Sequence, residues 1–279
     1  MSKKNINEMS FLDHLEDLRW HLIRISIAIL VGALLAFVNK VYIFGTLING
    51  PKDPSFITYR VLCSISKSLG LDESLCVAEM PFSIITTGLA DKFSIHIWTS
   101  ITLGFILAFP YILWELWRFI KPALHDNERK YSRSFICIGS LLFFIGVLFG
   151  YYIIAPLSVN FLGGYTLIPG DDFEAKPTIA SYIALIRSVV IAGGIIFELP
   201  IIIYFLTKVG LVTPEFLKTY RKHALVLVLI LSAIITPPDI ASQVVVAIPV
   251  LILYQISIYI SKWVIRNQEK NAKKELRNV

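Results

Sequence analysis

The chain has 279 residues, 56% of them apolar, and a formal net charge of +6. Soluble domains are usually about 45–50% apolar, so the composition excludes an ordinary soluble protein and indicates an all-α polytopic membrane protein. The sequence lacks a phosphate-binding loop, a zinc-ligand spacing and a nucleophile elbow. We therefore expect no enzyme, no metal and no cofactor. Basic residues cluster at the borders of apolar segments, which argues against a nucleic-acid partner.

Six apolar segments are candidates for membrane spans. They are residues 22–44, 95–120, 135–157, 179–207, 223–236 and 240–260. A hydrocarbon core of about 30 Å needs about 20 helical residues, so the fifth segment is short. The second segment contains Pro110 and the sixth contains Pro249. We expect one membrane domain, residues 1–279, built as a concave bundle of six transmembrane helices.

The distribution of Lys and Arg predicts the orientation. Basic residues gather at the N-terminus, after the second and fourth segments and in the tail, and they are sparse on the other side. The positive-inside rule then places both termini in the cytoplasm. Residues 1–21 become a cytoplasmic amphipathic N-terminus, 45–93 a periplasmic cap loop with a helix at 56–69, and 263–279 a cytoplasmic tail. Residues 1–20 are polar, so no cleavable signal peptide is expected.

The N-terminal segment reads as an amphipathic helix at the inner membrane surface. One face is apolar and is formed by Phe11, Leu15, Leu18 and Leu22. The other face carries Glu16, Asp17 and Arg19. These charges are candidates for a binding surface, and the alternative is a merely solvated face.

Glu198 lies inside the fourth apolar segment. An acid at that depth costs several kcal/mol unless it is paired or wetted, which makes it a functional candidate. Pro200 follows two residues later and should bend the helix there. Arg187 precedes Glu198 by eleven residues, an offset of about 20° on a helix, so both are expected to face one wet groove. The alternative is that Arg187 reaches outward to the headgroups.

Gln243 in the sixth segment can hydrogen-bond either to a partner helix or within the bundle. Two prolines, Pro237 and Pro238, should end the fifth helix in a tight outer turn, with Asp239 capping the sixth. In the cap loop, Cys63 and Cys76 lie on the expected oxidising side. They are predicted to form a disulfide, the alternative being two free thiols.

Four ordered motifs resemble one family. The first is His14-Leu15-Glu16-Asp17-Leu18-Arg19, and the second is residues 110–119 followed by Pro122-Ala123-Leu124 and Glu128-Arg129. The third is Phe197-Glu198-Leu199-Pro200, and the fourth is Thr236-Pro237-Pro238-Asp239 followed by Ser242-Gln243. Together they are similar to TatC, the multispanning subunit of the twin-arginine protein translocase.

The resemblance implies a receptor in the bacterial inner membrane for signal peptides that bear two consecutive arginines. It implies export of folded precursors with TatA- and TatB-like single-span partners, in several copies, using the proton-motive force. The arginine-reading acids map onto Asp17 and Glu128, with Phe119 beside them. The family commonly has Glu where this chain has Asp17, so Glu16 is a candidate to take part. The acid matching Glu198 is implicated in contact with the small partners.

The chemistry of these residue types agrees with that function. A guanidinium group binds a carboxylate through two parallel hydrogen bonds, which an ammonium group cannot reproduce. Two acids held apart would therefore read two arginines and reject lysines. The alternative function is a secondary transporter that uses Glu198 as a proton or ion carrier, although such proteins often show two related halves and none is evident here.

Overall fold

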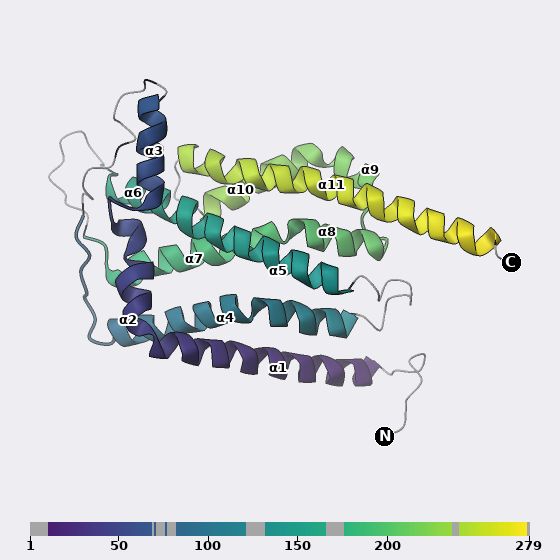
Figure 1. The fold of residues 1–279 in the computed structure, drawn as a ribbon, viewed down its shortest axis with the longest axis horizontal. Coiled ribbons are helices and arrows are strands. Elements are labelled where there is room, and N and C mark those ends of the chain that lie inside the picture. Colours follow the sequence, from purple (N-terminus) through teal and green to yellow (C-terminus); the bar gives the residue numbers. More distant parts are fainter. Residues whose placement is uncertain are drawn as a thin grey trace.

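The long helices of the computed structural model lie side by side, and the described chain starts and finishes at the same end of the bundle (Figure 1). The structure describes residues 11–68, 70, 76, 82–120, 132–165, 176–235 and 240–277. We call the end where α1 begins and α11 finishes the terminal end, and the opposite end, where α3 lies, the cap end. Within the described residues the only strand-like pairing is an isolated bridge between Ile85 and Thr178.

The elements of the bundle follow the predicted order. The helices that lie in the six candidate spans are α1 (Phe11–Val38), α4 (Asp91–Ile120), α5 (Ser132–Phe149), α7 (Ile179–Phe197), α8 (Leu199–Lys208), α10 (Arg221–Ile235) and α11 (Ile240–Arg277). The other elements are α2 (Lys40–Tyr42), η2 (Ile43–Ile48), η3 (Gly50–Lys52), α3 (Ile57–Ser68), η7 (Gly150–Ile154), α6 (Ala155–Gly163) and α9 (Pro214–Thr219). The helix predicted at 56–69 is confirmed as α3, which lies across the long helices at the cap end (Figure 1).

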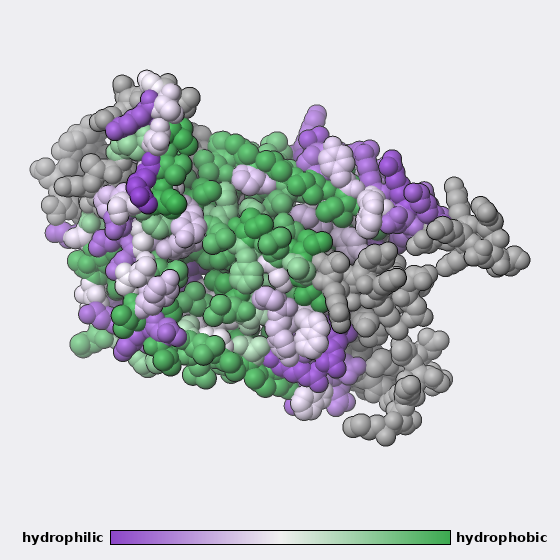
Figure 2. Space-filling model, in the orientation of Figure 1, coloured by the Kyte–Doolittle hydropathy of each residue, from purple (hydrophilic) through white to green (hydrophobic). Residues whose placement is uncertain are grey.

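Five helical segments in the described chain are long and apolar enough to cross a membrane. They are Leu15–Val38, Asp91–Phe119, Ile136–Gly163, Ile179–Lys208 and Gln243–Lys270. The remaining candidate, α10, is helical but has only 15 residues, or about 22 Å. The sixth span therefore stays a prediction. Figure 2 shows apolar residues over the middle of the visible face and hydrophilic residues gathered toward both ends, as a membrane belt requires.

Several predicted boundaries were wrong. The expected surface helix and first span are one continuous helix, α1, which ends at Val38 and not at residue 44. The third span continues through η7 and α6 to Gly163. The last helix runs 17 residues beyond residue 260, so the predicted tail is largely helical. At the start of α1 and the end of α11, polar residues continue the helix beyond the apolar run, where hydropathy no longer marks its limits.

The α1–α4 pair is packed at backbone contact. A Cβ on Gly104 of α4 would lie 2.5 Å from the backbone nitrogen of Ala33 on α1, so only glycine permits this approach. Toward the terminal end the same interface buries Ile25 against Ala108 and Ile112. This contact brings the two helices that carry the first two motifs side by side.

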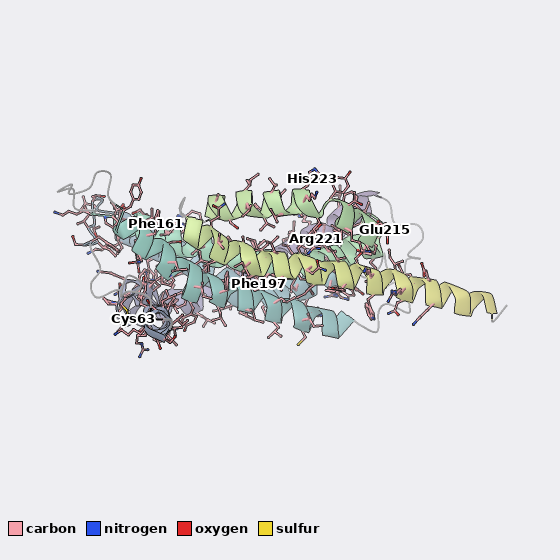
Figure 3. All side chains as sticks on the ribbon, turned by 90° about the horizontal axis from the view of Figure 1, so that it is seen from above. Cys63, Phe161, Phe197, Glu215, Arg221 and His223 are labelled. Atoms are coloured by element: carbon pink, nitrogen blue, oxygen red, sulfur yellow. A yellow bond between two sulfur atoms is a disulfide. The ribbon has the colours of Figure 1, made fainter. Side chains whose placement is uncertain are left out.

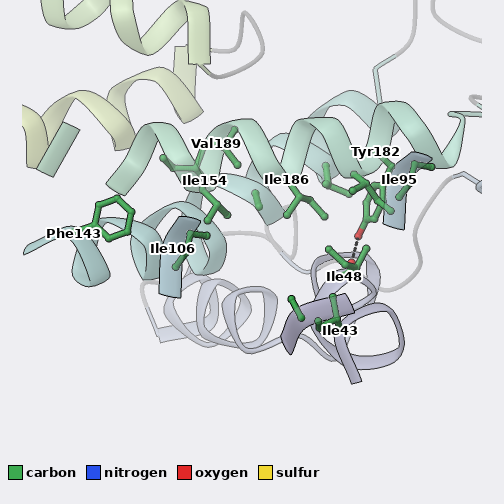
Figure 4. Packing of buried hydrophobic residues seen from close by; sticks show 14 of the residues in the cluster. Ile43, Ile48, Ile95, Ile106, Phe143, Ile154, Tyr182, Ile186 and Val189 are labelled. Atoms are coloured by element: carbon green, nitrogen blue, oxygen red, sulfur yellow. Dashed lines mark hydrogen bonds between the residues drawn. The ribbon is translucent and has the colours of Figure 1, made fainter. Parts of the chain in front are cut away.

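The central core lies between α4, α5 and α7. Phe109 and Phe143 stack with ring centroids 3.4 Å apart. Figure 4 shows Phe143 with Ile186 and Val189 of α7, which belong to the same buried cluster. α7 and α8 are separated at Glu198, where the α7 helix ends and Pro200 enters the first turn of α8. We predicted a bend at this point, and the helix is interrupted there, because proline cannot supply the amide that would continue it.

Tyrosines tie the cap to the bundle. Tyr59 of α3 donates to the carbonyl oxygens of Pro51 and Pro156, each at 2.9 Å. Tyr182 of α7 donates to the carbonyl oxygen of Ile48 at 2.8 Å, the dashed line in Figure 4. These bonds join α3 and α7 to the backbone of η2, η3 and α6.

Candidate functional site

The terminal end of the α1–α4 pair holds a buried acid. Glu115 of α4 has a side chain 1% exposed and contacts Nδ1 of His21 on α1. Tyr111 lies one turn earlier on α4 and donates to Oε1 of Glu115 at 2.9 Å. The imidazole and the phenol satisfy both carboxylate oxygens, which explains how a charged group is tolerated here.

Two predicted site residues lie at this same end. Asp17 precedes His21 by four residues, so the two are about 40° apart on α1 and Asp17 lies toward the α4-facing side. Phe119 follows Glu115 by four residues, and its ring centroid is 5.9 Å from that of His21. α1 enters the bundle at this end and α4 leaves it, so Asp17 and Phe119 both lie about one turn beyond the His21–Glu115 contact, toward the end of the bundle.

Glu16 occupies a different part of α1. It precedes His21 by five residues, which places it about 140° around the helix from the side that contacts α4. Both acids are exposed to solvent. Of the two, Asp17 is the one on the side of Phe119. Glu128, the other predicted arginine-reading acid, lies outside the described residues, as do Pro237, Pro238 and Asp239.

Sequence analysis did not select Glu115 or His21 as functional candidates. Glu115 was visible as an acid within an apolar segment, the same signal that singled out Glu198. Its partner could not be inferred locally, because His21 and Glu115 are 94 positions apart in the sequence.

Glu198 forms a second polar feature, deep in the bundle. It is 6% exposed, and neither carboxylate oxygen has a hydrogen-bond partner in the described part of the chain. A Cβ on Gly139 of α5 would lie 3.5 Å from its Oε2, so the carboxylate lies over that glycine. Figure 3 places the neighbouring Phe197 between the cap-end residue Cys63 and three residues nearer the other end, Glu215 of α9 and Arg221 and His223 of α10.

Arg187 and Gln243 have partners within the bundle. The guanidinium carbon of Arg187 lies 5.8 Å from the ring centroid of Trp98 on α4, in a cation–π contact, and the arginine is partly exposed. Gln243 of α11 donates from Nε2 to the carbonyl oxygen of Leu229 on α10 at 2.9 Å. Gln243 therefore joins two helices of this chain, one of its two predicted uses.

The cap end contains a disulfide. Cys63 at the C-terminal half of α3 is bonded to Cys76, with an S–S distance of 2.02 Å and a Cα–Cα distance of 4.5 Å. The bond closes a loop over a separation of 13 residues. It fixes the end of α3 to the chain that returns toward α4.

Apolar helices of membrane-spanning length, with polar groups at one end and an acid at depth, define a multi-pass helical membrane protein. A family model described as Sec-independent protein translocase protein (TatC) matches residues 13–249. The TatC of Blattabacterium sp. subsp. Periplaneta americana is 44% identical over 94% of this chain and 98% of its own length. That of Aquifex aeolicus is 35% identical over 95% and 100%.

Solved structures agree with the sequence comparisons. Two crystal structures of the twin-arginine translocase receptor TatC, one of them in the detergent DDM, are 35% identical to this chain and give TM-scores of 0.64 and 0.68. They cover 90% and 89% of this chain, and 99% of their own chains is matched. The chain belongs to the TatC family of Sec-independent protein translocase components. The secondary-transporter alternative is accordingly not favoured.

Proposed function

We propose that this chain is the receptor that binds twin-arginine signal peptides, with the terminal end of the bundle facing the cytoplasm of a bacterial inner membrane. The observation that supports this most directly is the placement of Asp17 and Phe119 at one end of the α1–α4 pair. The first inner loop begins directly after α4, and Glu128 follows Phe119 by nine residues in that loop. Asp17 and Glu128 would each accept one guanidinium group.

Recognition depends on local geometry. The chain carries a net charge of +6 and its inner rim is cationic, so long-range attraction of a basic peptide is not available. A carboxylate discriminates arginine from lysine by a pair of parallel hydrogen bonds. Phe119 would offer its ring to the apolar part of an arginine side chain or to the peptide segment that follows.

The test is binding of a fluorescent signal peptide to the purified chain in lipid nanodiscs. The Arg-Arg peptide should bind more tightly than its Lys-Lys counterpart. Charge-assisted hydrogen bonds contribute about 1.5–3 kcal/mol each, so Asp17→Lys or Glu128→Lys should weaken binding by about 10- to 150-fold. Equal affinity for the Arg-Arg and Lys-Lys peptides would remove the receptor assignment.

Glu16→Lys is the matched control. It makes the same change of charge one residue from Asp17 but on the side of α1 turned away from α4. Binding of the Arg-Arg peptide should fall far less than in Asp17→Lys. An equal loss in both variants would mean that the effect is general electrostatics and that Asp17 has no special role.

Glu198 is proposed to contact a TatA- or TatB-like single-span partner. The supporting observation is a buried carboxylate whose oxygens have no hydrogen-bond partner in the described chain. A polar side chain on a neighbouring helix would satisfy it, which is a strong reason for association at membrane depth. Arg187 lies nearer the cap end on α7 and could take part in the same helix contact.

The signal-peptide site and the Glu198 site would act in succession during export. Capture of a folded precursor at the cytoplasmic end would be followed by recruitment of the small partners along the bundle, in several copies and driven by the proton-motive force. No catalytic step is assigned to this chain.

A further inference from the structure

Two arginines of the chain itself lie beside the buried acid Glu115. A terminal nitrogen of Arg24 on α1 is 3.8 Å from Oε2, and a terminal nitrogen of Arg118 on α4 is 4.0 Å from Oε1. Their side chains are 42% and 54% exposed, whereas that of Glu115 is 1% exposed. Glu115 is thus buried in the interface between α1 and α4, and the two guanidinium groups approach it from the solvent-exposed edge of that interface.

Glu115 has closer partners than these two arginines. Tyr111 donates to Oε1, and Nδ1 of His21 contacts Oε2. Since both carboxylate oxygens are already engaged by a phenol and an imidazole, the longer contacts to the arginines act mainly through charge. Glu115 is therefore a buried negative charge that holds two partly exposed cations near it.

In a site that binds guanidinium groups through carboxylates, arginines of the chain itself can occupy those carboxylates and compete with the peptide. Arg24 follows Asp17 by seven residues, an offset of about 20°, so the two lie on the same face of α1 about 10 Å apart along the axis. Long side chains on a helix point back toward its N-terminus. Arg24 therefore points toward Asp17, and in the absence of another anion it would compete with the peptide for that carboxylate.

Arg118 is a weaker competitor for the peptide site, although it immediately precedes Phe119. Its side chain points back along α4 toward Glu115. Its guanidinium carbon also lies 5.8 Å from the ring centroid of Trp114. Of these two arginines, Arg24 is therefore the more direct competitor for Asp17, and Glu115 is the anion that draws it away.

We propose that Glu115 is a positioning residue of the signal-peptide site, holding Arg24 and Arg118 so that Asp17 stays open to the arginines of the peptide. This inference rests on the receptor function proposed above. It assigns Glu115 no contact with the peptide. Glu115 acts through the chain's own cations, so removing the cation that it holds should restore binding. A purely structural role of Glu115 would not allow such a rescue.

The experiment measures affinity for the Arg-Arg peptide in Glu115→Gln, whose amide keeps an acceptor for Tyr111 and a partner for His21 but has no charge. The dissociation constant should rise by about tenfold, since the freed Arg24 competes for one charged contact. Adding Arg24→Gln to Glu115→Gln should return it to within about twofold of the unaltered chain. Arg24→Gln alone should bind the peptide normally.

Two controls separate this effect from general electrostatics. Glu215→Gln removes one negative charge from exposed α9 and should leave binding unchanged. Arg221→Gln, at the start of α10, should fail to rescue Glu115→Gln, because it removes a cation that is not beside Glu115. Rescue by Arg221→Gln as complete as that by Arg24→Gln would overturn the proposal.

The remaining outcomes are equally decisive. Unchanged binding in Glu115→Gln, or a loss that Arg24→Gln does not restore, would overturn the positioning role. If Glu115→Gln does not fold, Glu115→Asp withdraws the charge by one methylene and should give a smaller loss, again restored by Arg24→Gln. Failure of the unaltered chain to prefer Arg-Arg over Lys-Lys would instead contradict the receptor function itself.

Discussion

Gly193 of α7 lies directly against Gly146 of α5. A Cβ on Gly193 would approach the carbonyl oxygen of Gly146 to 2.6 Å, closer than real side chains come to backbone. We expect Gly193→Ala to force α5 and α7 apart and to cost about 1–3 kcal/mol. A lowered midpoint of thermal unfolding in detergent would show this. Gly45→Ala is the control, since a Cβ there meets nothing within 4 Å and should leave the midpoint unchanged.

The disulfide of the cap should be detectable by counting thiols. The chain has three cysteines, and Cys137 is free and exposed. The denatured, unreduced protein purified from the membrane should therefore react at one thiol, and the reduced protein at three. Replacing Cys63 and Cys76 by serine should destabilise the cap by about 3 kcal/mol, measured as faster proteolysis of the cap. Three reactive thiols before reduction would contradict the bond.

Tyr59 should make the cap sensitive to strong alkali. Burial raises the pKa of its phenol above the ordinary value of 10.0. The folded state therefore keeps the proton where the unfolded state loses it, and this contribution to stability is complete below pH 10 and is lost as the pH rises beyond it. Tyr59→Phe should remove that part of the pH dependence together with the hydrogen bonds to the carbonyls of Pro51 and Pro156, at a cost of about 1–3 kcal/mol at neutral pH. Hydrogen exchange of α3 measures both effects.

Glu198→Leu should weaken binding of the proposed partner without lowering the stability of the chain. Removing a buried carboxylate that has no partner in the described chain should leave the midpoint of thermal unfolding unchanged or higher, because apolar replacements of such groups are neutral or stabilising. Copurification of the TatA-like partner should nevertheless fall. Glu198→Gln, which can still hydrogen-bond, should retain more partner than Glu198→Leu. Full copurification with Glu198→Leu would exclude this acid as the contact.

Gln243 and Gln255 of α11 offer a matched pair. Gln243 donates to the carbonyl of Leu229, whereas Oε1 of Gln255 is buried with no hydrogen-bond partner in the described chain. Gln243→Leu should loosen α10 from α11 and cost about 1 kcal/mol, and Gln255→Met should be neutral. The measurement is hydrogen exchange of α10. Equal effects of the two changes would show that Gln243 does not hold α10.

Hydropathy predicted the helical segments of this chain because apolar runs of about 20 residues have few other solutions in a membrane. A bend caused by Pro200 was predicted as well, and the helix is interrupted at Glu198, two residues before that proline. The limits of α1 and α11 were not, because charged residues with good helix propensity continue both helices beyond the apolar runs.

The candidate site was predictable only in part. Motifs identified Asp17 and Phe119, and the period of the helix then placed Asp17 on the side of α4. The contact between His21 and Glu115 depends on the close approach of α1 and α4 at Gly104, which is a property of the packed pair. No local pattern specifies such a contact, so the structure was needed to find it.

α11 has 38 residues and is about 57 Å long, nearly twice the thickness of the hydrocarbon core, and Figure 1 shows it projecting past the other helices. Its far end therefore extends away from the bundle. A fluorescent reporter or affinity handle joined to that end would be held at a distance from the terminal ends of α1 and α4. Labels used to measure signal-peptide binding are best attached there, where they would not obstruct the proposed binding site.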